Sequence, residues 1–202
     1  MRIVCLDLEG VLVPEIWIEF SRRSKIPALS RTTRDEPDYD KLMRERLDIL
    51  ARHQLGLPDL QDIINGMAPF DGAKEFVNEL RAHFQVVILS DTFYEFATPL
   101  MSRMDWPTLF CHRIEVAANG GIIYYRLRMP DQKRASVAAF NALHFKTIAV
   151  GDSYNDISML KEAHAGFFFR PPASIAAEFP QFPVMNDYQQ LRTAIFDASK
   201  RI

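Results

Sequence analysis

The segment "VCLDLEGVLVPE" (residues 4–15) joins an apolar run to two acidic residues and a glycine. The run predicts a buried β-strand, with Asp7 and Glu9 on either side of Leu8. Side chains two positions apart on a strand share one face, so both carboxylates are expected together if the strand continues. Acids this close to a hydrophobic strand are costly unless a metal, a hydrogen-bond network or a reaction uses them.

The bulk composition favours a globular α/β domain. The chain has 202 residues, of which 48% are hydrophobic, enough for one core with an insertion. Its net charge of -2 provides no general attraction for nucleic acid or an anionic membrane, so neither is expected as a partner. Two cysteines, Cys5 and Cys111, and no signal-like N-terminus indicate a reducing, cytoplasmic setting, with Cys5 in the core.

Strand-like and helix-like segments alternate along most of the chain. Helical periodicity covers residues 73–84, 133–145 and 158–165. The expected strands are "RIVCLDL", "FQVVILS", "LFCHRIEV", "TIAVGD" and "AGFFFR". This alternation predicts an α/β fold, a Rossmann-like and mostly parallel sheet with helices on both faces. The reactive groups of such a sheet gather beyond the carboxyl ends of its strands.

An insertion interrupts this alternation. Three amphipathic helical stretches follow one another within residues 15–69, with no strand between them, and predict a small helical cap. The α/β core is then residues 1–14 and 70–202. Alternation over residues 115–128, centred on Asn119-Gly120-Gly121, predicts a β-hairpin.

Four signals associated with strands occur in a fixed order. They are Asp7-x-Glu9-Gly10, then Ser90-Asp91-Thr92 after "VVIL", then Lys133, then "GDSYNDISML" at residues 151–160. Together they resemble the haloacid dehalogenase superfamily of phosphotransferases, over almost the whole chain. The helical insertion and the last segment resemble its phosphoserine phosphatase branch.

The residue types also point to phosphoryl transfer. A carboxylate can attack phosphorus to form an aspartyl phosphate, which divides one difficult displacement into two easier ones. Asp7 is our candidate for this nucleophile. Because two anions repel, a divalent cation is needed to bring carboxylate and phosphate together, and Mg²⁺ suits oxygen ligands.

The resemblance implies a particular Mg²⁺ site. Its ligands would be the Asp7 carboxylate, the main-chain carbonyl of Glu9, and Asp152, with Asp156 in support. Asp152 ends a predicted strand, whereas Asp156 lies near the start of the next helix, so the two can face one point. The alternative is that Asp152 and Asp156 are turn and N-cap residues only.

Glu9 is expected to protonate the leaving oxygen and later to take a proton from water. Most members of the family have Asp at this position, one methylene shorter. The phosphate-binding candidates are Ser90, Asp91 and Lys133. Asp91 stands where the branch usually has glycine, and three roles stay open for it: a backbone N–H donor to phosphate, a carboxylate that orients Lys133, or one that selects the acceptor.

Substrate recognition is assigned to the cap. Glu15 can pair with an ammonium group, and Arg46 can hold a carboxylate in a bidentate fork, which together suit phosphoserine. Asn155 is the third substrate-binding candidate. The resemblance further implies transfer of phosphate to homoserine. The sequence does not decide the oligomeric state, so a homodimer and a monomer both stay open.

Blander and competing interpretations stay open. Lys133, Glu15 and Arg46 could be ordinary solvated charges, and Ser90 a helix N-cap. The same chemistry could serve a sugar or nucleotide phosphate, and a receiver-like signalling module also uses a phosphorylated Asp. No role is predicted for the histidines, which are expected at the surface or half-buried, at positions 53, 83, 112, 144 and 164.

Overall fold

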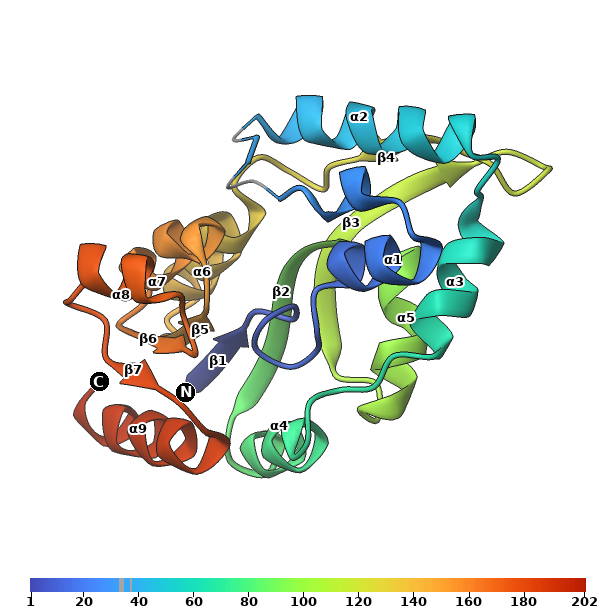
Figure 1. Ribbon diagram of the computed structural model, residues 1–202. Helices are drawn as coiled ribbons and strands as arrows, with labels where there is room; N and C mark the ends of the chain where they lie inside the picture. Colours follow the sequence, from blue (N-terminus) through green and yellow to red (C-terminus); the bar gives the residue numbers. More distant parts are fainter. Residues whose placement is uncertain (33–34, 37) are drawn as a thin grey trace.

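The computed structural model describes residues 1–202 except 33, 34 and 37. Seven strands in this part of the chain form one sheet, in the order β4-β3-β2-β1-β5-β6-β7 (Figure 1). All neighbours pair in parallel except β3 and β4, which form the predicted hairpin. The strands are β1 (Arg2–Leu6), β2 (Gln85–Phe93), β3 (Thr108–Val116), β4 (Ile122–Arg126), β5 (Lys146–Gly151), β6 (Ala165–Phe169) and β7 (Val184–Met185).

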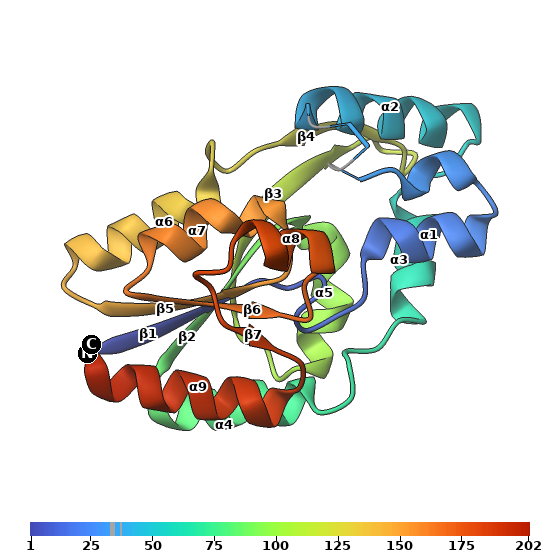
Figure 2. The same ribbon diagram turned by 60° about the vertical axis from the view of Figure 1, so that its left-hand side comes forward.

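Helices cover both faces of the sheet, as the sequence predicts. Strand alternation sends Val4 and Leu6 into one apolar cluster, and Ile3 and Cys5 into another. Helices α4 and α9 cover the first face, and α6 and α7 the second (Figure 2). The core helices are α4 (Ala73–His83), α5 (Tyr94–Arg103), α6 (Gln132–Ala142), α7 (Ile157–Glu162), α8 (Ala173–Glu178) and α9 (Tyr188–Arg201).

Three elements were not predicted: α5, β7 and α9. Strand β7 has only two residues, too short for periodicity to register. Helix α9 does carry a sequence signal, since Leu191, Ile195 and Ala198 are buried at helical spacing and the Asp187 side chain caps the N-terminus. The fold class is confirmed, whereas α5, β7 and α9 came only from the structure.

The insertion folds as helices beside the hairpin. It contains α1 (Ile16–Ser24), the 3₁₀ helix η1 (Pro27–Ser30), α2 (Tyr39–Arg52) and α3 (Leu57–Asn65). Helix α2 lies along β4, where the Tyr125 hydroxyl donates to the Asp40 carboxylate (Figure 1). At the start of α3, the Leu57 amide donates to the Gly120 carbonyl at 2.8 Å. The division of the chain into core and cap at residues 14/15 and 69/70 stays a prediction.

In the part of the chain that the structure describes, no helix is both long enough and apolar enough to cross a membrane.

Candidate active site

The carboxyl ends of three adjacent strands meet at one cavity. Asp7 directly follows β1, Ser90 belongs to β2 and Asp152 directly follows β5. These strands are neighbours in the sheet, so the three side chains converge although they are far apart in sequence. The cavity has a volume of about 410 Å³ and is lined by Asp7, Glu9, Glu15, Arg46, Ser90, Asp91, Lys133, Asp152 and Asn155, among others. It includes every predicted site residue except Asp156, which is fully buried beside it.

A tight turn sets the geometry after β1. The sequence suggested that strand alternation would place Glu9 on the side of Asp7. The strand ends at Leu6, however, so alternation does not position Glu9. Instead the amides of Leu12 and Val13 both donate to the Leu8 carbonyl, which folds the chain back over the strand end. Gly10 has φ +79, and a Cβ there would lie 2.4 Å from Asp152 Cγ. A glycine is therefore needed both for the turn and for the approach of Asp152.

Lys133 is the central cation of the site. Its Nζ donates to Asp156 Oδ1 at 2.8 Å and lies 2.9 Å from Asp7 Oδ1 and 3.9 Å from Asp91 Oδ2. The side chain is 3% exposed, which excludes a solvated surface lysine. Burial opposes its charge, but Asp156, Asp7 and Asp91 together raise its pKa well above the usual value. Lys133 is therefore ionised when the site is assembled.

Three buried carboxylates form a cluster beside this lysine. Ligand oxygens of Asp7, Asp152 and Asp156 lie within 4.8 Å of one another. Asp156 Oδ2 accepts from the Asp152 amide at 2.9 Å and from the Ser153 amide at 3.1 Å, so it also closes the turn before α7. The turn role and the cluster role coexist. An all-oxygen donor set of this kind fits a hard divalent cation such as Mg²⁺.

The electrostatics of Asp7 indicate that it depends on a nearby cation. Burial, followed by the charge of Asp156, raises the pKa of Asp7 well above its usual range, and Lys133 opposes this rise. The Leu8 amide donates to Asp7 Oδ1 at 2.7 Å, and Lys133 contacts the same oxygen. A divalent cation at the cluster would add the positive charge that keeps Asp7 ionised.

Glu9, Glu15 and Arg46 meet on the cap side of the cavity. Burial, and then the charge of Glu15, raise the pKa of Glu9 to about 8, while its Oε2 accepts from the Ile16 amide at 2.9 Å. Glu9 is therefore largely protonated at neutral pH. This is the state that a general acid needs.

Arg46 is not the solvated helix arginine of the alternative interpretation, because it is only 6% exposed. Its guanidinium lies 4.4 Å from the Trp17 ring centroid, and Nη2 donates to the Arg31 carbonyl at 2.7 Å. Its buried Nε has no hydrogen-bond partner among the described residues. Burial lowers the pKa of Arg46 to about 10, with Tyr39, Glu9 and Glu15 opposing. Arg46 is thus a desolvated cation that can receive an anion.

An irregularity in β2 presents Ser90 to the cavity. The β2–β3 register breaks between Leu89 and Phe93, so residues 90–92 leave the regular ladder. Ser90 is buried inside β2, and its Oγ accepts from the Thr92 amide at 3.2 Å. Since α5 begins only at Tyr94, Ser90 is not a helix N-cap.

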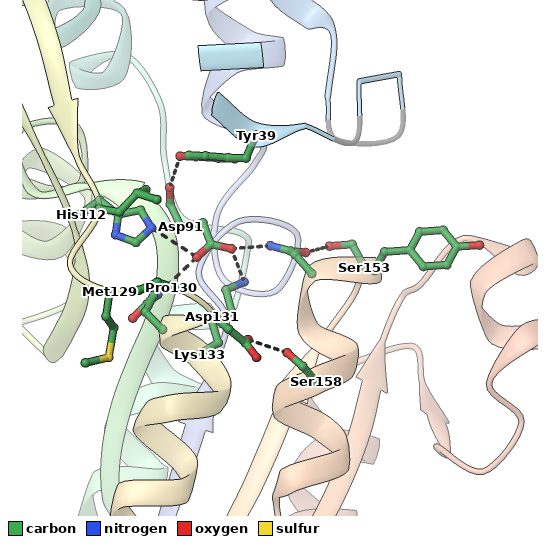
Figure 3. Close-up of a pocket in the computed structure, with 13 residues that line it drawn as sticks. Tyr39, Asp91, His112, Met129, Pro130, Asp131, Lys133, Ser153 and Ser158 are labelled. Carbon is green, nitrogen blue, oxygen red and sulfur yellow. Dashed lines mark hydrogen bonds and ion pairs between the residues drawn. The ribbon is translucent and has the colours of Figure 1, made fainter. Parts of the chain in front are cut away.

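Asp91 is a hub that connects several elements (Figure 3). Asn155 Nδ2 donates to its Oδ2 at 3.0 Å, and Gln132 Nε2 lies 3.4 Å from its Oδ1. His112 Nε2 is 3.6 Å from Oδ1, and the Tyr39 hydroxyl donates to the main-chain carbonyl at 3.1 Å. Burial opposes ionisation, but Lys133, His112 and Asn155 lower the pKa of Asp91 below its usual range.

Three residues of this hub were missed by the sequence analysis: Tyr39, His112 and Gln132. The expectation that His112 is at the surface or half-buried was wrong, because its side chain is 4% exposed beside Asp91. Its Nδ1 accepts from the Arg128 amide at 3.0 Å, so in the neutral ring Nε2 carries the proton toward Asp91. No motif marked these residues, which come from α2, β3 and α6 and meet only around Asp91 of β2 in the folded protein.

Comparison with known proteins adds independent findings. Residues 1–164 match the family described as haloacid dehalogenase-like hydrolase. A Pseudomonas aeruginosa protein named phosphoserine phosphatase ThrH is 54% identical over 201 residues, which cover 100% of this chain and 98% of that protein. A phosphoserine phosphatase of Pseudomonas syringae pv. tomato is 52% identical over 201 residues, covering 100% of this chain and 85% of the relative.

Solved structures agree on the fold. A phospho-aspartyl intermediate analogue of phosphoserine phosphatase superimposes with a TM-score of 0.77 at 19% identity, covering 96% of this chain and 98% of that one. A substrate-bound phosphoserine phosphatase complex gives 0.74 at 19% identity, covering 96% of each chain. At this level of identity the likeness supports the shared architecture.

Proposed function

Because the chain belongs to the haloacid dehalogenase-like hydrolase family, we propose that it hydrolyses phosphoserine through an aspartyl phosphate formed on Asp7. The observation that carries this proposal is a single cavity with chemical groups at both ends. Lys133 lies between Asp7 and Asp156 at one end, and Glu15 and Arg46 line the cap side. The names of the relatives at 54% and 52% identity support the same substrate.

The acidic cluster fits a resident Mg²⁺. Asp7, Asp152 and Asp156 would hold it, with the main-chain carbonyl of Glu9 as a further oxygen ligand. When bound, the cation neutralises negative charge on the carboxylate and the phosphoryl group.

In the first half-reaction, a carboxylate oxygen of Asp7 attacks phosphorus. Both described contacts of this side chain are made by Oδ1, so we assign Oδ2 as the attacking atom. Lys133 and the Ser90 hydroxyl stabilise the phosphoryl oxygens as charge develops on them. Protonated Glu9 delivers its proton to the serine oxygen as the bond to phosphorus breaks.

In the second half-reaction, Glu9 acts in reverse. The carboxylate that remains after proton transfer takes a proton from water, and the oxygen of that water attacks phosphorus. The bond from phosphorus to Asp7 breaks, which restores the free carboxylate and releases phosphate. One group thus serves as acid and then as base, helped by a pKa of about 8 near the working pH.

The cap side of the cavity favours an amino acid over a sugar or nucleotide. Arg46 presents a buried Nε with no partner among the described residues, which suits the α-carboxylate of the substrate. Glu15 lines the same cavity and suits the ammonium group. A sugar phosphate without a carboxylate would leave the buried Arg46 Nε without a hydrogen-bond acceptor from the substrate.

Transfer to homoserine is the second part of the proposal. Homoserine carries the same ammonium and carboxylate groups as serine, and a hydroxyl one methylene further away. The pair formed by Glu15 and Arg46 would therefore recognise it, and Glu9 would take its hydroxyl proton as it does from water.

Phosphate release from a panel of phosphorylated metabolites, with Mg²⁺ present, tests the proposal. We expect phosphoserine to be the preferred substrate, with acid-stable labelling of Asp7 after rapid quench. Preference for a sugar or nucleotide phosphate would contradict the substrate, and a stable label without turnover would favour a receiver-like switch. Absence of phosphohomoserine on adding homoserine would remove the transfer step alone.

A further inference from the structure

A second and larger cavity adjoins the catalytic one. It has a volume of about 800 Å³ and is lined on its outer side by Leu127, Met129 and Tyr154, which are 45%, 40% and 44% exposed. This cavity is therefore reached by solvent. The residues that line both cavities are Tyr39, Asp91, Lys133, Ser153 and Asn155.

Asp91 lines both cavities and lies at their boundary. Its carboxylate is held from the η2 turn (Tyr154–Asp156) by Asn155, from α6 by Gln132 and from β3 by His112. Its carbonyl receives the hydroxyl of Tyr39, the first residue of α2 in the cap. Three elements that are separate in sequence therefore contact this side chain, which is 31% exposed, and a fourth, α2, contacts the main chain of the same residue.

This boundary lies close to the reacting atoms. Lys133, which contacts Asp7 at 2.9 Å, also lines the larger cavity. Tyr39 lines the catalytic cavity together with Glu9. Asp91 and Tyr39 thus lie between the larger cavity and both the nucleophile and the proton donor.

We propose that the Asp91 side chain is a partition that sets how an aspartyl phosphate is divided between water and an alcohol acceptor. This inference rests on the proposed phosphoenzyme mechanism. In either route the bond from phosphorus to Asp7 breaks and a bond from phosphorus to the acceptor oxygen forms. Glu9 takes the proton of the acceptor. By filling the boundary, Asp91 limits the water that reaches phosphorus from the larger cavity and leaves time for an amino acid with a hydroxyl group to bind.

Two substitutions separate the volume of Asp91 from its charge. Asp91→Asn keeps the size, but it loses the charge beside Lys133 and replaces one acceptor oxygen by an NH₂ donor. Asp91→Gly removes the partition and keeps the Tyr39 contact, because that bond uses the main-chain carbonyl. Asp91→Ala is a second small variant in case the glycine protein does not fold.

The chain offers a matched control at Asp131. This residue lines the larger cavity only, bonds to Ser158 at 2.8 Å and has φ 45, so Asp131→Gly fits its backbone. The same chemical change is then made in the same cavity, away from the boundary.

The test is rapid-quench kinetics with ³²P-labelled phosphoserine and Mg²⁺, with and without homoserine. We expect the Asp91→Gly or Asp91→Ala phosphoenzyme to lose its label to water at least about ten-fold faster than the native enzyme. The ratio of phosphohomoserine to phosphate should fall by a similar factor. Asp91→Asn should change both quantities clearly less than the two small variants do, and Asp131→Gly should stay within about two-fold of the native enzyme.

The outcomes separate this inference from the proposed function. Native enzyme that takes up no label from phosphoserine would refute the proposed mechanism itself. Labelled Asp91→Gly and Asp91→Ala enzymes with native rates of water-dependent label loss would overturn only the partition. An Asp91→Asn enzyme that behaves like Asp91→Gly would also overturn it, because charge rather than volume would then be responsible.

Discussion

At the scale of single residues, Asp7 and Glu9 are suited to different tasks because their surroundings differ. Asp7 is 4% exposed and shares Lys133 with Asp156, so a cation compensates its charge. Glu9 faces another carboxylate, Glu15, and burial together with this neighbour raises the pKa of Glu9 to about 8. Two acids two positions apart are therefore suited to be a nucleophile and a proton donor, respectively.

Asp7→Asn should remove turnover. An amide is a poor nucleophile for phosphorus, so we expect kcat for phosphoserine to fall by roughly 10⁴-fold while the far-ultraviolet circular dichroism stays native. Asp105→Asn, at an exposed salt bridge with Lys74, is the control and should keep native kcat. Turnover near the native rate in the Asp7 variant would exclude the aspartyl phosphate.

The pKa of Glu9 predicts the alkaline side of the pH profile. Since the protonated carboxyl is the donor and its pKa is about 8, kcat/KM should be constant near neutral pH and fall as the pH rises through about 8. Glu9→Gln should abolish this decline and lower kcat/KM by about 10²-fold. A profile of kcat/KM from pH 6 to 10 for both proteins checks the sign.

The same variant can be probed with a substrate that needs no acid. p-Nitrophenolate is a stable leaving group, so Glu9→Gln should still release a burst of one equivalent from p-nitrophenyl phosphate before turnover stalls. An unchanged alkaline decline in Glu9→Gln, or the absence of a burst, would count against the role of Glu9.

At the scale of elements, the turn that follows β1 and the first residues of α2 complete the site. Gly10 lets the turn pass against Asp152, and Tyr39 ties α2 to β2 through the Asp91 carbonyl. The cap helices thus contact the catalytic strands directly. This is how specificity residues on an inserted element come to face chemistry on the sheet.

Gly10→Ala should damage the site more than the fold. Its Cβ would lie 2.4 Å from Asp152 Cγ, and φ +79 is strained for any residue with a side chain. We expect a stability loss of about 1–3 kcal/mol, together with a loss of activity and a weaker affinity for Mg²⁺. Gly72→Ala, at φ +82 with only an ordinary 3.5 Å contact, is the control and should lose stability without losing specific activity. Equal activity in the two variants would contradict the role of this turn.

Helix α2 allows a direct test of substrate recognition. Arg46→Lys cannot keep the bidentate fork, so KM for phosphoserine should rise about 10- to 100-fold while kcat changes less. Arg44, on the same helix, is 64% exposed and pairs with Asp40, so Arg44→Lys should leave KM unchanged. A native KM in both variants, measured by initial rates, would require a different substrate class.

At the scale of the whole molecule, the sheet order places like charges together and thereby links folding to cation binding. Asp7 follows β1, whereas Asp152 and Asp156 lie in the segment after β5, so the three carboxylates meet only when β1 and β5 pair. Lys133 offsets only part of their mutual repulsion, and a bound divalent cation would relieve the rest. A ligand that binds only the folded protein raises its stability by mass action.

Mg²⁺ should therefore stabilise the protein as well as activate it. At about 100 times its dissociation constant we expect about 2.7 kcal/mol of added stability, or roughly 5–10 °C in Tm by differential scanning fluorimetry. Asp152→Asn should lose most of this shift, and chelation with EDTA should abolish activity. The same Tm with and without Mg²⁺ in the native protein would argue against the metal site.

The sequence by itself determined much of this protein. Apolar runs ending in Asp7, Ser90 and "GDS" at residues 151–153, separated by helical periodicity, predict a parallel sheet with its chemistry at one edge. Local patterns are sufficient here, because a strand end fixes where the next side chain emerges. The helical insertion and the hairpin could also be predicted from local sequence patterns.

Only the tertiary structure decided the rest. The side on which Glu9 lies depends on a turn stabilised by hydrogen bonds, not on strand alternation. The hub of Asp91 joins Tyr39, His112, Gln132 and Asn155, residues with no common motif. Burial and pairing set the charge states of Lys133 and Glu9, and both depend on neighbours brought together from distant parts of the chain. Residue identity determines which chemistry is available, whereas the packed environment determines which residue performs it.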